Sequence, residues 1–241
     1  MEPALSHRPL ILFLGAPGSG KGTQSLLLSE KLKLSRIETS KLLEERFRKA
    51  KPKETVEIAG KPYSLDEQKE RWTKGFLNES AFVADTVLKK LKRMNEENGN
   101  EGVLLDGFPR SIEQIELLLP LALNMFDKKH LVVLYLDISQ EDSVWRNEHR
   151  RICELLRHTI LCIPETERLT ICPIDGSKLV KRELDDPQVI KTRLEEFKKQ
   201  TLPLLSYFQE NGITILKVSG EGTVSEVFSR ISEQLARAIK Q

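Results

Sequence analysis

Short apolar runs alternate with longer stretches of helical periodicity along most of this chain. The runs are rich in branched residues and nearly free of polar ones, which is typical of strands buried on both faces of a parallel sheet. They cover residues 10–14, 102–106, 131–137 and 213–218. Helical patterns cover residues 25–32, 78–95, 111–125, 187–211 and 223–240. Strands that alternate with helices predict an α/β fold, with a doubly wound parallel sheet and helices on both faces.

Two charged stretches interrupt this alternation. Residues 44–75 include the runs Lys51-Pro52-Lys53 and Gly60-Lys61-Pro62. Residues 149–184 hold all three cysteines and several arginines, and they have no clear helix or strand period. We therefore expect both stretches to be excursions from the core.

Composition narrows the class of protein. A chain of 241 residues can form one sizeable core with small inserted lobes. The net charge of +2 argues against a general nucleic-acid surface, and three cysteines cannot form a full disulfide framework. The first apolar run is too short for a signal peptide, and no stretch approaches a membrane span. The sequence predicts a cytoplasmic protein with no nucleic-acid or membrane partner.

A glycine-rich loop joins the first predicted strand to the first predicted helix. It reads Gly-Ala-Pro-Gly-Ser-Gly-Lys-Gly-Thr-Gln over residues 15–24. Glycines let the backbone N–H groups curl around a phosphate, and the following helix adds the positive end of its dipole. Lys21 supplies a cation for the β- and γ-phosphates, and the hydroxyl of Thr23 can face Mg²⁺. The loop residues expected at the nucleotide are Gly15, Gly18, Ser19, Gly20 and Gly22.

A second motif, Asp-Gly-Phe-Pro-Arg, ends the second predicted strand at residues 106–110. Asp106 at the carboxyl end of a parallel strand is well placed to hold Mg²⁺ through water. Gly107 lets a ligand approach the backbone, and Arg110 can grip a phosphate with two parallel hydrogen bonds.

Together the two motifs resemble the adenylate kinase family of nucleoside monophosphate kinases, over about residues 8–238. The resemblance implies a P-loop kinase core at residues 1–37, 79–147 and 186–241. It also implies two mobile lobes, an NMP-binding lobe at 38–78 and a lid at 148–185. The implied reaction is ATP + AMP ⇌ 2 ADP with Mg²⁺, in a monomer that forms no covalent intermediate.

The resemblance assigns further residues one at a time. Arg146 lies against the donor adenine, Arg150 reaches the donor phosphates, and Gly220 belongs to the donor side. Arg182 and Arg193, eleven residues apart, clamp the transferred phosphoryl group, where charge develops.

The acceptor lobe departs from the family pattern. Thr39 is kept, but Lys41 stands where an Asp is expected and Glu44 where a phosphate-binding Arg is expected. We hypothesise that Lys41 supplies charge to the acceptor phosphate and that Glu44, three residues on, holds its ammonium. Gln114, four residues after Arg110, favours adenine as the acceptor base, because a side-chain amide complements its edge. A kinase for UMP, CMP or GMP and a catalytically weak regulatory nucleotide-binding protein are the alternatives.

The lid departs as well. Many bacterial relatives bind zinc there with two Cys-x-x-Cys pairs, and the matching positions here are Cys153, Leu156, Cys172 and Asp175. Three ligands and a leucine do not close a tetrahedral site, so we expect no structural zinc. His158 and Cys162 are possible substitutes at irregular spacing. The lid is instead expected to be held by apolar packing of Ile152, Leu155, Ile163, Leu169 and Ile171.

Overall fold

The computed structural model describes residues 8–97 and 101–239, and its core is a parallel five-stranded sheet in the order β10-β6-β1-β5-β2. β1 pairs with β5 on one side and with β6 on the other, and every pairing in this sheet is parallel. This confirms the predicted α/β fold. The strands are β1 (Leu10–Gly15), β2 (Ser35–Glu38), β5 (Val103–Asp106), β6 (Leu131–Asp137) and β10 (Thr214–Ser219).

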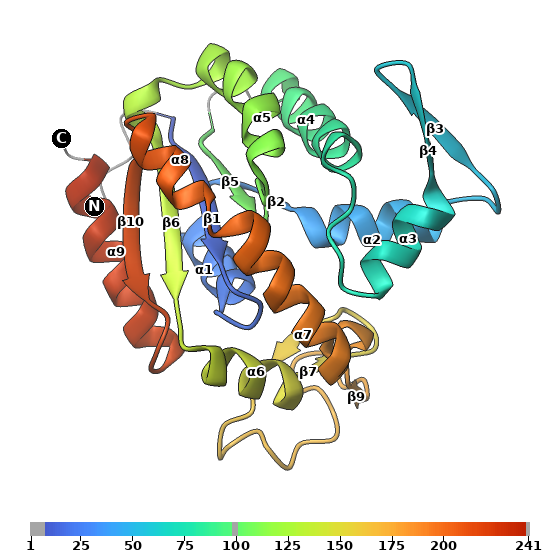
Figure 1. Ribbon diagram of the computed structural model, residues 1–241. Helices are drawn as coiled ribbons and strands as arrows, with labels where there is room; N and C mark the ends of the chain where they lie inside the picture. The colour runs from blue at the N-terminus through green and yellow to red at the C-terminus, as the bar shows by residue number, and fades with distance from the viewer. Residues whose placement is uncertain (1–7, 98–100, 240–241) are drawn as a thin grey trace.

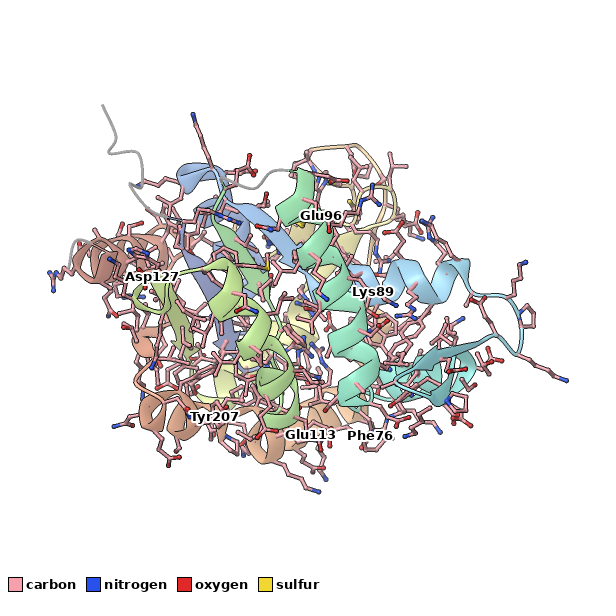
Figure 2. The ribbon with its side chains drawn as sticks, turned by 90° about the horizontal axis from the view of Figure 1, so that it is seen from above. Phe76, Lys89, Glu96, Glu113, Asp127 and Tyr207 are labelled. Atoms are coloured by element: carbon pink, nitrogen blue, oxygen red, sulfur yellow. The ribbon has the colours of Figure 1, made fainter. Side chains whose placement is uncertain are left out.

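Helices cover both faces of this sheet. Successive side chains of β1 point to opposite faces, so they pack against two different sets of helices. Leu10, Leu12 and Leu14 pack in one apolar cluster with α4, α5 and α8. Ile11 and Phe13 pack in a second cluster with α1 and α9. The bounds are α1 (Lys21–Leu32), α4 (Ser80–Glu97), α5 (Ile112–Met125), α8 (Leu204–Glu210) and α9 (Val224–Ile239). Figure 2 shows α4 and α5 side by side, with Lys89 and Glu96 on α4 and Glu113 at the beginning of α5.

The single helix predicted over residues 187–211 is divided in the structure. A π-helical turn, η3, follows α7, and Pro203 immediately precedes α8. Proline has no N–H to donate one turn back, so the α-helical hydrogen-bond ladder is interrupted at this position. The remaining connecting elements are α6 (Gln140–His149), α7 (Pro187–Glu196) and η3 (Phe197–Thr201), with short 3₁₀ turns η1 (Lys128–His130) and η2 (Glu183–Asp185).

The first charged stretch forms a small lobe beside the core. It consists of α2 (Thr39–Lys49), an antiparallel hairpin of β3 (Thr55–Ile58) and β4 (Lys61–Ser64), and α3 (Leu65–Thr73). Figure 1 shows the hairpin projecting to the right, away from the parallel sheet. The ring of Phe47 on α2 stacks on that of Phe82 on α4, with 6.2 Å between ring centroids, and its centroid lies 6.0 Å from that of Trp72. Aromatic packing therefore fixes the lobe to the core.

The second charged stretch forms a three-stranded antiparallel sheet in the order β8-β7-β9. Its strands are β7 (Arg151–Cys153), β8 (Thr159–Ile160) and β9 (Leu179–Val180). The buried cluster is Cys153, Ile160, Cys172 and Leu179, with Leu169 packed against it. The predicted apolar packing is therefore wrong in part, because Leu155, Ile163 and Ile171 are exposed.

No helix in residues 8–97 and 101–239 has the length and apolar character needed to cross a membrane. The domain limits at 38–78 and 148–185 stay a prediction, and the ends of the predicted core segments, residues 1–7 and 240–241, lie outside the described residues.

Candidate functional site

The glycine loop is held against α6 by its backbone. Gly18 has a φ of +79°, and a Cβ there would meet Asn147 Nδ2 at 2.5 Å and the Ser143 carbonyl oxygen at 2.8 Å. The Ser143 hydroxyl donates to the carbonyl of Pro17 at 2.5 Å. Gly20, the N-cap of α1, has a φ of +92°. Glycine is required at both positions, at Gly20 by backbone conformation and at Gly18 also by close packing.

Lys21 folds back over this loop. Its Nζ donates to the carbonyls of Gly15 at 2.6 Å and Ala16 at 2.7 Å, and it lies 3.2 Å from the Ser19 hydroxyl. Burial, together with the charge of Arg110, lowers the pKa of Lys21 to about 7. A bound phosphate would favour the charged ammonium, because an anion nearby stabilises it.

Two arginines contact one buried carboxylate, that of Asp185, which the sequence did not single out. Arg150 grips Asp185 with two hydrogen bonds, from Nε to Oδ2 at 2.9 Å and from Nη2 to Oδ1 at 2.5 Å. Arg193 lies 3.6 Å from the same carboxylate and donates to the Leu184 carbonyl at 2.9 Å. Burial, with repulsion from Arg150 and Arg182, lowers the pKa of Arg193 to about 9. Burial also lowers the pKa values of Arg110 and Arg182.

One wall of the cavity comes from α6 and the loop after β10. Arg146 donates from Nη1 to the carbonyl of Gly220 at 2.9 Å, so two residues assigned to the donor by resemblance are in contact. Arg151, the residue after Arg150, holds the lid loop by donating to the carbonyls of Thr166 and Leu169.

On the other side of the site, Thr39 and Gln114 are buried and face the cavity. The Thr39 hydroxyl has no hydrogen-bond partner among residues 8–97 and 101–239. Gln114 Oε1 accepts from the backbone N–H of Arg110 at 2.7 Å, and Arg110 Nε donates to the Gly107 carbonyl at 2.9 Å. An unsatisfied buried hydroxyl is costly, so Thr39 is a candidate ligand contact.

The hypothesis that Glu44 holds Lys41 is corrected by the structure. Lys41 Nζ lies 3.2 Å from Glu38 Oε2 and its side chain is largely exposed. Glu44 pairs instead with Arg157 of the lid at 3.0 Å, across the mouth between the two lobes. Spacing along an isolated helix would pair Lys41 with Glu44. In the structure, Glu38 lies just before α2 and pairs with Lys41, and Arg157 of the lid pairs with Glu44. The role of Lys41 at the acceptor phosphate stays a prediction.

These side chains converge on one cavity of about 780 Å³. Lys41 is the one predicted nucleotide contact that does not line it, and Glu38, which was not predicted, does. Predicted residues that line it are Gly15, Gly18, Ser19, Gly20, Lys21, Gly22, Thr23, Thr39, Asp106, Gly107, Arg110, Gln114, Arg146, Arg150, Arg182, Arg193 and Gly220.

The lid brings together a second group of polar side chains. Four side chains each offer one potential metal-ligand atom, and these atoms all lie within 4.8 Å of one another. The side chains are those of Cys153, His158, Cys172 and Asp175. Asp175 Oδ2 accepts from the Cys153 thiol at 2.9 Å and lies 3.3 Å from His158 Nδ1. That thiol contact lowers the pKa of Asp175. The expectation of an incomplete ligand set is thus corrected, because the turn after β7 brings His158 to the place that Leu156 was expected to hold.

Comparison with known proteins agrees with this geometry. The family model described as adenylate kinase matches residues 13–213. An adenylate kinase of Clostridium tetani is 33% identical over 230 residues, which cover 93% of this chain and 97% of that protein. An adenylate kinase of Staphylococcus aureus is 32% identical over 222 residues, covering 90% and 94%. One from Mycoplasma mycoides is 29% identical over 226 residues, covering 93% and 98%.

Proposed function

Because the chain belongs to the adenylate kinase family, it is a nucleoside monophosphate kinase, and we propose that it transfers the γ-phosphoryl group of MgATP to AMP. The observation that carries the proposal is the convergence of the glycine loop, four arginines and the unpartnered Thr39 hydroxyl on one cavity. The two nucleotides would enter from opposite sides and meet at the arginines.

On the donor side, the loop N–H groups and Lys21 would hold the triphosphate. Arg146, kept in place by the Gly220 carbonyl, would lie along the adenine. Bound Mg²⁺ neutralises phosphate charge during phosphoryl transfer. The hydroxyl of Thr23 and the carboxylate of Asp106 fit that ion, because Mg²⁺ prefers oxygen ligands. Asp106 would act through water.

The transferred group would pass between Arg110, Arg150, Arg182 and Arg193. In-line phosphoryl transfer needs positioning and charge stabilisation more than covalent chemistry. Asp185 fixes the plane of Arg150 and the Leu184 carbonyl holds Arg193 before substrate arrives, so the guanidinium groups need little rearrangement. A phosphoryl group bearing negative charge also offsets the repulsion among these buried cations.

On the acceptor side, we propose that Thr39 and Gln114 contact AMP and that Gly107 lets it approach the backbone. One lone pair of Gln114 Oε1 already accepts from Arg110, which orients its amide. A coupled assay across AMP, GMP, CMP, UMP and dTMP tests the acceptor. We expect AMP to have the highest kcat/KM, and Gln114→Asn to lower that preference. Faster turnover of another monophosphate would refute AMP as the acceptor.

We also propose that the lid binds a structural divalent metal ion through Cys153, His158, Cys172 and Asp175. Two thiolates, an imidazole and a carboxylate form a donor set that suits zinc. The ion would brace the turns of the lid sheet and take no part in the reaction.

Finally, we propose that the enzyme is a cytoplasmic monomer whose two lobes, residues 38–78 and 148–185, close over the nucleotides. All three cysteines are free thiols, which fits a reducing compartment. Analytical ultracentrifugation tests the monomer, and a 241-residue chain that sediments as a dimer would contradict it.

A further inference from the structure

Arg36, on a strand with no clear apolar pattern, contacts Asp106, which lines the cavity. Its Nη2 donates to Asp106 Oδ2 at 2.7 Å and its Nε to the Ser25 hydroxyl at 2.8 Å. Nη2 also lies 3.3 Å from the Gly22 carbonyl of the glycine loop. Only 14% of the side chain is exposed. One guanidinium therefore links β2, β5 and the start of α1.

Arg36 also separates two carboxylates. Glu38 and Asp106 are register partners at the carboxyl ends of β2 and β5, and both line the cavity. Arg36 Nη2 lies 2.9 Å from Glu38 Oε2 as well as 2.7 Å from Asp106 Oδ2. Two like charges on neighbouring strand ends repel each other, and both would repel a nucleotide phosphate. The guanidinium offsets that repulsion.

The oxygens of Asp106 are used unequally. Oδ2 accepts from both Ser25 Oγ, at 2.7 Å, and Arg36. In residues 8–97 and 101–239 no group donates to Oδ1. The carboxylate is therefore held by one oxygen while the other is available to a ligand in the cavity.

We propose that Arg36 is a positioning residue for phosphoryl transfer: it holds Asp106 through Oδ2, so that Oδ1 serves the hydrated metal ion, and it neutralises Glu38. This inference rests on the proposed function. It adds a residue to the machinery that acts through Asp106 and touches neither nucleotide.

The test compares Arg36→Ala, Arg36→Lys and the double variant Arg36→Ala with Glu38→Gln. We expect Arg36→Ala to lower kcat and raise the Mg²⁺ concentration for half-maximal activity, each by roughly 10- to 100-fold, as loss of a partner to a metal ligand typically does. KM for AMP should change little. Arg36→Lys should restore part of kcat, and so should the double variant, because it removes one of the two repelling carboxylates.

A second measurement does not depend on turnover. Mn²⁺ binding to the enzyme–ADP complex, measured from the EPR signal of free Mn²⁺, should weaken by the same factor in Arg36→Ala and recover in the double variant. The matched control is Arg93→Ala, which removes an arginine from an exposed ion pair with Glu97 on α4.

Unchanged Mn²⁺ binding in a folded Arg36→Ala protein would overturn the proposal. So would a double variant no better than Arg36→Ala in both Mn²⁺ binding and kcat. A wild-type enzyme inactive on AMP would refute the proposed acceptor instead. The Mn²⁺ experiment on the ADP complex would still decide the role of Arg36.

Discussion

The glycine loop on the proposed donor side is shaped mainly by backbone contacts, whereas the start of α2 on the proposed acceptor side is surrounded by ion pairs between charged side chains. On the donor side, Gly18 packs against α6 at distances that admit no side chain, and Lys21 is held by two carbonyls. At the start of α2, Glu38 pairs with both Arg36 and Lys41, and Glu44 pairs with Arg157 of the lid. A loop shaped by backbone contacts accepts few substitutions. Charged residues can instead exchange positions and partners while the net charge near the ligand stays the same.

The comparison predicts the largest losses where charge meets the transferred phosphoryl group. We expect Lys21→Ala and Arg110→Ala each to lower kcat/KM by about 10²–10³-fold, since removing one preorganised donor costs that much. Steady-state kinetics with ATP and AMP measure the effect, and thermal unfolding reports whether the core is intact. Near-normal turnover in Lys21→Ala would contradict the assignment of the glycine loop to the donor site.

Metal removal tests the lid cluster of Cys153, His158, Cys172 and Asp175, none of which lines the cavity. We expect purified protein to contain one equivalent of zinc, and chelation to lower Tm by roughly 5–10 °C, because about 1 kcal/mol shifts Tm by about 2–4 °C at this size. Elemental analysis and calorimetry measure these values. His158→Ala should abolish metal binding, and the matched control Leu156→Ala, at an exposed neighbouring position, should keep it. Metal-free protein with an unshifted Tm would contradict the assignment.

The lowered pKa of Lys21 makes donor binding depend on pH. Below about pH 7 the free enzyme already carries the ammonium; above it, binding of the triphosphate must take up a proton. Affinity for ATP should therefore fall as pH rises above 7, by at most about tenfold per pH unit. Titration calorimetry at pH 8 in buffers of different ionisation enthalpy measures the proton uptake. Lys21→Met should abolish it, and uptake retained in that variant would assign the proton to another group.

The smallest effect is expected at Lys41. Its exposed ion pair with Glu38 contributes little, since pairs of this kind are worth about 0–1 kcal/mol. We expect Lys41→Ala to raise KM for AMP by about two- to threefold, through loss of positive charge near the acceptor phosphate, and to leave KM for ATP unchanged. If KM for AMP stays constant, Lys41 belongs to the surface and the acceptor phosphate depends on the arginines alone.

The parts of the site that could be predicted are those written contiguously in the chain. The glycine loop needs positive φ and close packing, and the residues that meet these needs are neighbours in sequence. Asp106 and Arg110 likewise share one strand end and the turn after it. Strands β1, β5 and β6 were predicted because burial on both faces leaves an uninterrupted apolar run, whereas β2 buries only Ile37 and gave no such signal.

The parts that could not be predicted depend on segments brought together by folding. Asp185 lies 35 residues from Arg150, and only the lid sheet brings them together. His158 follows Cys153 by five residues, a spacing that becomes meaningful once the turn after β7 is known. Arg36 is a single arginine in a weak strand pattern. Its proximity to Asp106 follows from the pairing of β2 with β5. The predicted lid packing is wrong in part because so small a segment cannot bury all of its apolar side chains, and Leu155, Ile163 and Ile171 are exposed.

The hairpin of β3 and β4 stands clear of the main sheet, so both of its strands have an open edge (Figure 1). Such edges invite pairing with another chain. Here each strand is only four residues long, Pro62 offers no N–H to a neighbour, and Lys61 adds charge beside it. These features of the hairpin oppose edge-to-edge aggregation. The projection of the hairpin into solvent therefore need not lower the solubility of the enzyme.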